Sequence, residues 1–442
     1  MEKKKVIFIG CGYVSVWAYK ELYGRLRKKI NNKEIEVTVI SISNCHDFHG
    51  FTGEFINGFL PINFKSTPQE QIFKGANYIQ AKLKSIQASE NAVEYINDNG
   101  DVAKLHYDQL VLGTGSLDNF DSIEGANAYG LSVKKSNGIK ELRERLVRNL
   151  TEAENSNDPN EIESLLSFTV IGAGFAGVEV SGNLVESLNI LKSDFPILEK
   201  YSFKVNLVYS SDEILPQLQK KRVLRNYSIK TIEKLGIHLY PNQKVQKIVD
   251  GKVFMEDGSS LNTNFVVCTM GQTNDVYSKE SSMKINDSKR LIVDAFLKNP
   301  EHGNIWSGGD AAIVKRPYFS GTCNYDALWA IKHGTRIGKN LTRVLKNKKP
   351  GKFKYPGLGQ TASFYKNKAI LEIYGLPFTG ILAWYIRIGF FLYFMPSRRL
   401  AFNAFKSILF DSKIRKSSWH SLIQQNQEEL IIDRDFNKVE AL

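Results

Sequence analysis

Two glycine-rich motifs, each directly after a short apolar run, are the residues whose types and spacing best fit a chemical task. The first is Gly10-Cys11-Gly12-Tyr13-Val14-Ser15 and the second is Gly172-Ala173-Gly174-Phe175-Ala176-Gly177. In this pattern the first glycine permits a tight turn, and the second lets the backbone approach a pyrophosphate at the start of a helix. Two such motifs predict two bound dinucleotides, and such a pair is typical of hydride transfer between a nicotinamide and a flavin.

Parallel strands must position these motifs. The apolar runs that we predict to be strands are 6–9, 36–40, 107–112, 168–171, 204–208, 264–269 and 304–307. Two of them end in further glycine-rich turns, which contain Thr114 and Gly115 in one case and Gly309 and Asp310 in the other. Ligands of a doubly wound sheet bind at the carboxyl ends of its strands, which is where all these turns fall.

The order of these elements predicts an α/β protein with two Rossmann-like dinucleotide-binding domains, the second inserted in the first. The outer domain is predicted over 1–160 and 285–345, and the inserted one over 165–284. Residues 346–442 are predicted to form a C-terminal amphipathic helical region that associates with a membrane.

The four cysteines are scattered without a Cys-x-x-Cys pair. This spacing argues against a disulfide framework, a structural zinc site and a vicinal redox disulfide. The run Cys45-His46-Asp47-Phe48-His49 resembles a metal cluster, but no further ligand set with zinc spacing appears, and a metal-free loop is the expectation. Hydrolase and NTPase motifs are missing from the sequence.

Positive charge is concentrated near the C-terminus. Residues 331–420 contain 18 Lys or Arg and two acids, whereas the whole chain has a net charge of +13. The basic residues flank apolar and aromatic segments, which favours an anionic membrane surface as partner and argues against nucleic acid.

One apolar segment, 376–395, carries Arg387 as its single charge. Its length would allow a membrane span, but the central arginine and Pro377 argue against one. The following residues, 397–410, are predicted to form an amphipathic helix with basic shoulders that lies in a membrane interface. A helix of the protein core or of a dimer contact is the alternative.

The two motifs in this order, the Leu112-Gly113-Thr114-Gly115 turn, the Gly309-Asp310 turn and the basic apolar tail resemble the type II NADH dehydrogenases. These are single-subunit, membrane-surface flavoproteins that bind two dinucleotides. The resemblance covers nearly the whole chain. It implies FAD as a non-covalent cofactor, NADH or NADPH as substrate, and a quinone or another small electron acceptor as partner.

The resemblance also implies which residues act. The positions implied to bind FAD are Gly10, Gly12, Ser15, Ser41, Thr114, Gly115, Gly309 and Asp310. NADH or NADPH would bind at Gly172, Gly174 and Gly177, and Glu179 would lie near the nicotinamide as a catalytic residue. The family's quinone segment reads Ala-Gln-x-Ala-x-Gln, whereas here Leu328 and Lys332 replace both glutamines. Lys332 is the second candidate catalytic residue, because it could hydrogen-bond a quinone carbonyl.

Two more positions depart from the usual pattern. An acid commonly accepts hydrogen bonds from a ribose hydroxyl at the end of the second strand, but Ser41 and Tyr209 stand there in the two motif units. A site without this acid would also tolerate a 2′-phosphate, and the choice between NADH and NADPH stays open.

The main hypothesis is an NAD(P)H:acceptor oxidoreductase, FAD-dependent and peripheral on the cytoplasmic side of the cell membrane, with a homodimer as the expected assembly. The alternative is a flavoprotein that binds NAD(P)H for sensing or docking, similar in logic to apoptosis-inducing factor. The missing ribose acids and the altered quinone segment motivate this second hypothesis.

Overall fold

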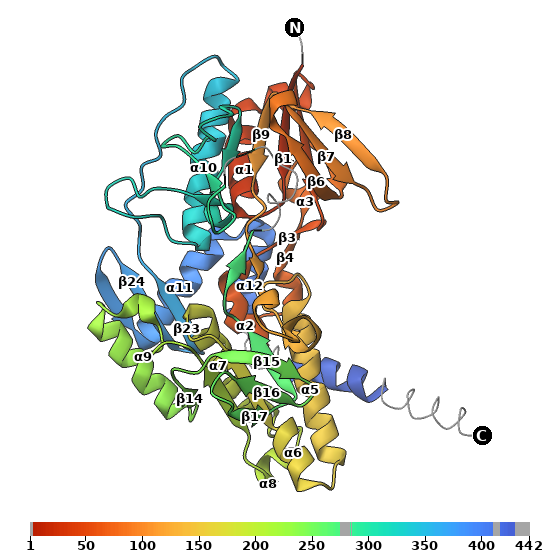
Figure 1. Cartoon of the computed structure of the whole chain (residues 1–442), viewed down its shortest axis with the longest axis vertical. Coiled ribbons are helices and arrows are strands. Elements are labelled where there is room, and N and C mark those ends of the chain that lie inside the picture. Colours follow the sequence, from red (N-terminus) through yellow and green to blue (C-terminus); the bar gives the residue numbers. More distant parts are fainter. Residues whose placement is uncertain (1–2, 275–282, 284, 410–415, 429–442) are drawn as a thin grey trace, which may run out of the picture. The chain divides into compact units, whose positions relative to one another are not determined.

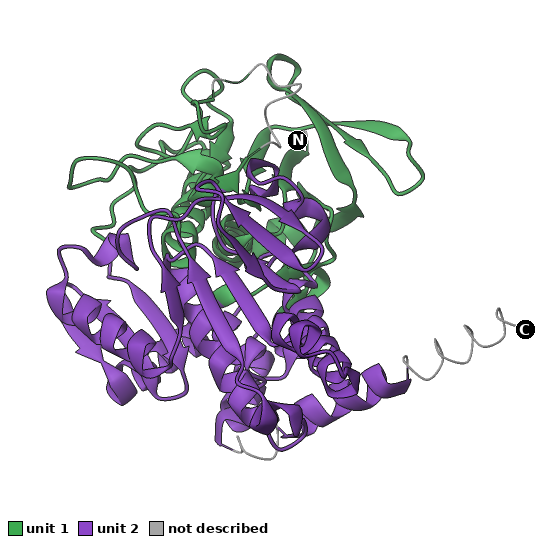
Figure 2. Ribbon diagram, turned by 60° about the horizontal axis from the view of Figure 1, so that its bottom comes forward, with its two compact units in different colours: residues 1–49, 66–117, 272–357 green, residues 50–65, 118–271, 358–442 purple. Residues whose placement is uncertain are grey.

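A computed structural model describes residues 3–274, 283, 285–409 and 416–428 of the chain (Figure 1). These residues form two compact units, which Figure 2 distinguishes by colour. Unit 1 comprises 1–49, 66–117 and 272–357, and unit 2 comprises 50–65, 118–271 and 358–442.

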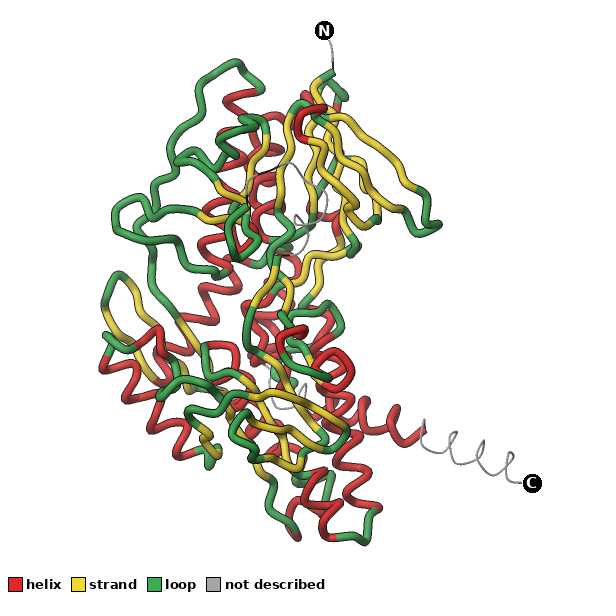
Figure 3. The backbone as a smooth tube through the Cα atoms, in the orientation of Figure 1, coloured by secondary structure: helices red, strands yellow, loops and turns green. Residues whose placement is uncertain are grey.

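Helices and strands alternate along much of both units (Figure 3). The helices of unit 1 are α1 (Tyr13–Asn31), α3 (Gln69–Ile72) and α10 (Ala327–Val344). Those of unit 2 are α2 (Thr52–Ile56), α4 (Ala126–Tyr129), α5 (Gly138–Asn155), α6 (Pro159–Leu165), α7 (Phe175–Leu191), α8 (Ile197–Lys200), α9 (Arg222–Lys234), α11 (Gly380–Phe394) and α12 (Arg398–Leu409). Residues 416–428 are also helical.

The main sheet of unit 1 is parallel and has the strand order β21-β9-β1-β2-β5. Its strands are β1 (Lys4–Ile9), β2 (Ile35–Ser41), β5 (Asn77–Gln80), β9 (Gln109–Leu112) and β21 (Ile305–Ser307). The central strand β1 is buried from Val6 to Ile9. Such continuous burial is typical of a parallel sheet that is covered on both faces.

Smaller strands complete unit 1. The antiparallel sheet consists of β6 (Lys82–Gln87), β7 (Ala92–Ile96) and β8 (Val102–His106). Two short pairs are β3 (Cys45–Asp47) with β4 (Ser66–Pro68), and β20 (Leu291–Ile292) with β22 (Ala312–Ile313). The two-residue strands β10 (Leu117–Asp118) and β19 (Gln272–Thr273) lie at the boundaries of the units in the sequence.

The main sheet of unit 2 is also parallel, with the order β11-β18-β12-β13-β14. Its strands are β11 (Gly130–Leu131), β12 (Ser167–Ile171), β13 (Lys204–Val208), β14 (His238–Tyr240) and β18 (Phe265–Cys268). An antiparallel sheet consists of β15 (Val245–Val249), β16 (Lys252–Met255) and β17 (Ser260–Asn262).

The C-terminal segment is built into unit 2. Its antiparallel sheet consists of β23 (Thr361–Tyr365), β24 (Lys368–Ile373) and β25 (Leu376–Thr379). Strand β23 packs against α7, and α11 packs against β24. No helix in the described part of the chain is both long and apolar enough to cross a membrane.

The α/β dinucleotide-binding architecture agrees with the sequence-based prediction, since each glycine motif joins a central parallel strand to a helix. The compact units group the chain differently from the predicted ligand domains, because 118–160 and 50–65 belong to unit 2. The assignment of FAD to 1–160 and 285–345 and of NAD(P)H to 165–284 concerns ligands and stays a prediction. Phe410, the last residue of the predicted amphipathic helix, lies outside the described residues.

Candidate dinucleotide and redox sites

The first motif forms a backbone-to-backbone contact at the carboxyl edge of the unit 1 sheet. Gly10 has a φ of +80°, which a residue with a Cβ rarely adopts. A Cβ on Gly12 would lie 2.6 Å from the carbonyl oxygen of Gly113 in the turn after β9. The turns after β1 and β9 therefore touch directly and leave no room for side chains between them.

Helix α1 begins at this contact without a side-chain cap. Gly12 is its N-cap residue, and the first turn contains no acidic side chain. Ser15 is completely buried, and its Oγ has no hydrogen-bond partner among the described residues. Free N–H groups at a helix start together with its positive dipole end fit a pyrophosphate. The first motif is therefore suited to the phosphates of a dinucleotide.

Ser41 lies at the end of β2, where an acid commonly binds the ribose. Its Oγ lies 3.4 Å from Sγ of Cys11, and the thiol of Cys11 lies 2.9 Å from the carbonyl oxygen of Cys45. His46 is buried, and its Nδ1 lies 2.7 Å from the carbonyl oxygen of Cys11. Burial lowers the pKa of His46 to about 4, which keeps this ring neutral at pH 7. The Cys45–His49 run thus packs on the first motif.

Asp310 belongs to a network that sequence reasoning identified only in part. Its Oδ2 accepts a hydrogen bond of 2.9 Å from Ser116, which follows Thr114 and Gly115. The side-chain amide of buried Asn274 is placed to donate to the carbonyl oxygens of Gly115 at 2.6 Å and Asp310 at 3.3 Å. The two turns predicted to hold the cofactor are therefore joined within unit 1.

Gly309 is held by a histidine that the motifs do not indicate. The N–H of Gly309 donates to Nδ1 of His333 at 2.9 Å. His333 is buried in α10, and burial lowers its pKa to about 3. A neutral imidazole is required for Nδ1 to accept this bond. His333 therefore fixes the Gly309-Asp310 turn.

Lys332 is half-buried in α10, one residue before His333. Its Nζ lies 5.4 Å from the ring centroid of Tyr355, a cation–π distance. Burial lowers the pKa of Lys332, and nearby Lys339 adds to the decrease. The predicted catalytic residue Lys332 is thus in unit 1, whereas Glu179 is in unit 2.

The second motif joins β12 to α7 in unit 2. A Cβ on Gly177 would lie 1.8 Å from the carbonyl oxygen of Gly172, so this close turn excludes any larger residue. Around Gly174 the nearest atom to such a Cβ is Nε2 of Gln217, 3.5 Å away. The protein itself leaves space at Gly174, the N-cap of α7, and no side chain caps this helix. That space fits the close approach of a pyrophosphate.

Glu179 joins a buried charge cluster two residues after Gly177. Arg387 on α11 donates to Oε1 of Glu54 at 2.6 Å and to Oε1 of Glu179 at 3.3 Å. The N–H of Ser363 also donates to Oε1 of Glu179, at 2.8 Å. The side chains of Arg387 and Glu54 are 1% and 2% exposed, and that of Glu179 is 16% exposed. We call Glu54, Glu179 and Arg387 the charge cluster.

The charge cluster has one cation for two carboxyl groups. Burial raises the pKa of Glu179 to about 7, and the neighbouring Glu54 adds to the increase, whereas Arg387 and the N–H of Ser363 oppose it. A carboxyl group with this pKa can accept or release a proton near neutral pH. This is the chemical capability that a predicted catalytic residue requires.

Sequence reasoning identified Glu179 but missed Glu54 as its neighbour. Glu54 is 333 residues from Arg387 in sequence and lies in the short helix α2. Its available signal was a single acid in the otherwise uncharged run 48–64. Asp326 was also missed, although it caps α10 by accepting from the N–H of Trp329 at 3.0 Å. An aspartate before an amphipathic helix is a recognisable cap signal.

The described residues contain no group of three or more His, Cys, Asp or Glu side chains that could hold a metal ion.

Comparison with protein families gives a match over residues 4–330 to the model described as pyridine nucleotide-disulphide oxidoreductase. A probable NADH dehydrogenase of Dictyostelium discoideum is 26% identical over 394 residues, which are 87% of this chain and 84% of that protein. A type II NADH:quinone oxidoreductase of Staphylococcus aureus is 23% identical over 384 residues, 86% of this chain and 92% of that protein.

A similar fold occurs among solved structures. The structure of NDH2 from Plasmodium falciparum in complex with NADH matches with a TM-score of 0.82 at 16% identity. The match covers 92% of this chain and 98% of that one. At this identity the likeness concerns the fold, and it extends over both compact units.

Proposed function

The chain belongs to the pyridine nucleotide-disulphide oxidoreductase family, and from this premise we propose that it is an FAD-dependent NADH dehydrogenase that passes electrons to a quinone. The observation that carries the proposal is the presence of one uncapped, glycine-started helix after a parallel strand in each compact unit. The relatives named NADH dehydrogenase or type II NADH:quinone oxidoreductase support the same activity, because the sequence similarity extends over most of their length.

FAD fits the residues of unit 1. The start of α1 would hold its pyrophosphate, and Asp310, fixed by Ser116, would accept hydrogen bonds from the hydroxyls of its ribityl chain. Ser41 offers a hydroxyl at the ribose position, and its partner Cys11 orients it. When bound, FAD supplies a carrier that takes two electrons from a nicotinamide and delivers them to an acceptor.

NADH is proposed to bind unit 2 at Gly172, Gly174 and Gly177. Among nearby cations that could favour the 2′-phosphate of NADPH, Lys221 is already paired, with its Nζ 2.6 Å from Oε1 of Glu372. Arg225 is paired with Glu213. Lys220 and Arg222 are exposed. The support for NADH over NADPH therefore comes from the relatives that are named NADH dehydrogenase or NADH:quinone oxidoreductase.

Two side chains are proposed to act on protons and on the acceptor. Glu179 is proposed to exchange a proton near neutral pH, since burial and Glu54 raise its pKa. Lys332 is proposed to donate a hydrogen bond to a quinone carbonyl, and its lowered pKa makes this ammonium a better proton donor than an exposed lysine.

The C-terminal part of unit 2 is proposed to contact the anionic, cytoplasmic surface of a membrane. Arg387 points inward to the charge cluster, so the outer face of α11 is uncharged: Ile381, Leu382 and Tyr385 are 56%, 55% and 56% exposed. On α12, Phe402 and Leu409 are 57% and 62% exposed. Exposed Arg398, Arg399 and Lys406 flank these apolar side chains. Large apolar side chains beside cations are typical of a membrane interface.

The activity is tested by mixing the purified, flavin-loaded protein with NADH without oxygen. We expect the flavin absorbance to bleach within seconds and to recover when a soluble quinone is added. Slow bleaching with a long-lived charge-transfer band and no quinone turnover would favour the sensing or docking alternative. Protein that binds no FAD, or flavin that neither NADH nor NADPH bleaches, would overturn the proposal.

The membrane contact is tested with the paired substitution Leu382→Ser and Tyr385→Ser. We expect it to weaken sedimentation with anionic vesicles while leaving NADH oxidation by a soluble quinone unchanged. Val102→Ser is the matched control, because Val102 is 52% exposed in unit 1. Equal vesicle binding by both variants would contradict the proposed face. A homodimer stays a prediction, and light scattering of the purified protein tests it.

A further inference from the structure

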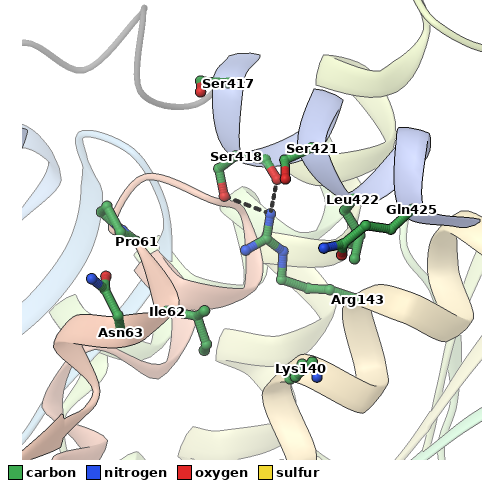
Figure 4. A pocket seen from close by; sticks show the side chains of 10 residues that line it. All are labelled: Pro61, Ile62, Asn63, Lys140, Arg143, Ser417, Ser418, Ser421, Leu422 and Gln425. Carbon is green, nitrogen blue, oxygen red and sulfur yellow. Dashed lines mark hydrogen bonds between the residues drawn. The ribbon is translucent and has the colours of Figure 1, made fainter.

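Unit 2 contains a pocket of about 490 Å³ that the proposed redox activity does not use (Figure 4). Its walls come from α5, from the helical residues 416–428 and from residues 61–63, at the start of the 3-10 helix Ile62–Phe64. The lining side chains are Pro61, Ile62, Asn63, Lys140, Arg143, Ser417, Ser418, Ser421, Leu422 and Gln425. The lining combines two cations with three hydroxyl groups and contains no acidic side chain.

Arg143 is the side chain that gives the pocket its chemistry. It is 4% exposed, and no ion pair joins it to a carboxylate of the described residues. Its Nη2 donates to Oγ of Ser418 at 2.9 Å and to the carbonyl oxygen of Ser418 at 3.3 Å, as the dashed lines in Figure 4 show. Its buried Nε has no hydrogen-bond partner in the part of the chain that the structure describes.

Such an arginine is costly for the protein unless something else compensates its charge. A buried charge is usually paired, because apolar surroundings do not compensate the free energy that is lost when the charge leaves water. The ring of Trp419 lies 4.1 Å from the guanidinium, and this cation–π contact offsets part of the cost. An aromatic ring does not neutralise a positive charge, so the guanidinium retains the capacity to bind an anion.

The remaining walls place further donors beside this arginine. Lys140 precedes Arg143 by one helical turn on α5, and both side chains line the pocket. Lys140 is exposed, with its Nζ 3.5 Å from Glu144 in a solvent-screened pair that contributes little. Ser421 lies one turn after Ser417 and Ser418 on the opposite wall. A planar guanidinium fork, an ammonium and hydroxyl donors together match the oxygens of a phosphate group.

We propose that this pocket binds a phosphate group through Arg143, Lys140 and the serine hydroxyls of residues 417–421. The phosphate can belong to inorganic phosphate or to the headgroup of a lipid, and Ile62 and Leu422 provide an apolar wall for the lipid case. Phe59, two residues before the lining residue Pro61, packs against Trp384 of α11, with 5.3 Å between the ring centroids. The site does not depend on the proposed NADH dehydrogenase activity.

The experiment uses the full chain saturated with FAD and compares Lys140→Gln with Lys84→Gln, an exposed lysine of unit 1. In the first arm, inorganic phosphate is titrated by calorimetry at constant ionic strength. In the second arm, vesicles containing phosphatidic acid are compared with vesicles given the same charge by oleate. We expect Lys140→Gln to weaken binding about tenfold in one arm, as loss of a charge-assisted hydrogen bond does, while Lys84→Gln has no effect.

The outcomes separate the sources. A Lys140 effect in the first arm identifies inorganic phosphate, and an effect confined to phosphatidic acid vesicles identifies a lipid headgroup. Ser421→Ala should weaken binding in the same arm of the experiment. Arg143→Lys should weaken this binding further, because lysine keeps the positive charge but lacks the planar guanidinium fork. If Arg143→Lys perturbs folding, the variants at the exposed residues Lys140 and Ser421 still show whether the pocket binds a phosphate group. Equal binding by Lys140→Gln and Lys84→Gln in both arms would overturn the proposal.

Discussion

The guanidinium of Arg387 lies 2.6 Å from a carboxylate oxygen of Glu54, and both side chains are almost completely removed from solvent. The pair joins α11 to α2, and a second nitrogen of Arg387 also donates to the carbonyl oxygen of Gly50. The apolar C-terminal segment is thereby attached to the interior of unit 2 through its one charge. The same pair sets the electrostatic environment of Glu179.

Removal of Arg387 should therefore destabilise unit 2 strongly. Arg387→Gln leaves Glu54 buried without its cation, and the loss of one partner of a buried pair costs about 3–5 kcal/mol. We expect a large decrease in the urea midpoint of unfolding, followed by circular dichroism. Arg399→Gln, an exposed position on α12, is the control and should change the midpoint little. A midpoint for Arg387→Gln that equals that of the control would contradict the structural role of the pair.

Glu179 should make the stability of the protein depend on pH. Because its pKa is raised to about 7 from an ordinary value near 4.5, folding favours the protonated form. Its stabilising contribution is complete below about pH 4.5 and is lost as the pH rises to about 7. Glu179→Gln resembles the protonated form at every pH. Relative to the wild type, this variant should gain free energy of unfolding, roughly 3 kcal/mol, between these limits.

The measurement is a series of urea titrations of both proteins from pH 4.5 to pH 8. The difference between them isolates Glu179 from the other titrating groups. A difference that stays constant over this range, or that has the opposite sign, would show that the carboxyl group is not protonated preferentially in the folded state.

Glu54→Gln should move the titration of Glu179 to lower pH. The negative charge of Glu54 is one of the causes that raise the pKa of Glu179, and the amide keeps the shape while removing this charge. If Glu179 acts on protons during turnover, the inflection in the pH profile of kcat/KM for NADH should shift to the acidic side in this variant. Glu186→Gln is a carboxylate control on the same helix α7. An inflection that shifts equally in the two variants would argue against a specific effect of Glu54.

The glycine motifs could be predicted from the sequence because their constraints are local. A tight turn, a buried strand and a helix start all lie within about ten residues, so the pattern around Gly172 or Gly10 is sufficient. The turns at Thr114 and Asp310 were predicted for the same reason. Their connection through Ser116 and Asn274 needs contacts between distant segments, which no local pattern encodes.

Arg387 shows why the rest could not be predicted. In the sequence it is a single charge within an apolar run, and its acidic partners are 208 and 333 residues away. The amphipathic helix after it forms as predicted, as α12, but its apolar stripe is divided. Ala401 and Ala404 are buried against the protein, whereas Phe405 and Leu409 are exposed. Periodicity identifies an apolar face without identifying what covers it.

Gly338→Ala should destabilise unit 1, because α10 lies directly on α1 at this residue. A Cβ on Gly338 would lie 2.3 Å from the carbonyl oxygen of Ala18, and a backbone atom cannot move aside as a side chain can. Forcing the two helices apart costs about 1–3 kcal/mol. Since α1 begins at the first glycine motif, the same substitution should also lower the amount of FAD that copurifies.

Gly24→Ala is the matched control within α1, where a Cβ would meet nothing within 4 Å. Alanine there should raise the free energy of unfolding by about 0.5–1 kcal/mol, since glycine is less favourable inside a helix. The measurement is the melting temperature of each variant in thermal unfolding. Equal melting temperatures for Gly338→Ala and Gly24→Ala would show that the packing of α10 on α1 does not need a glycine.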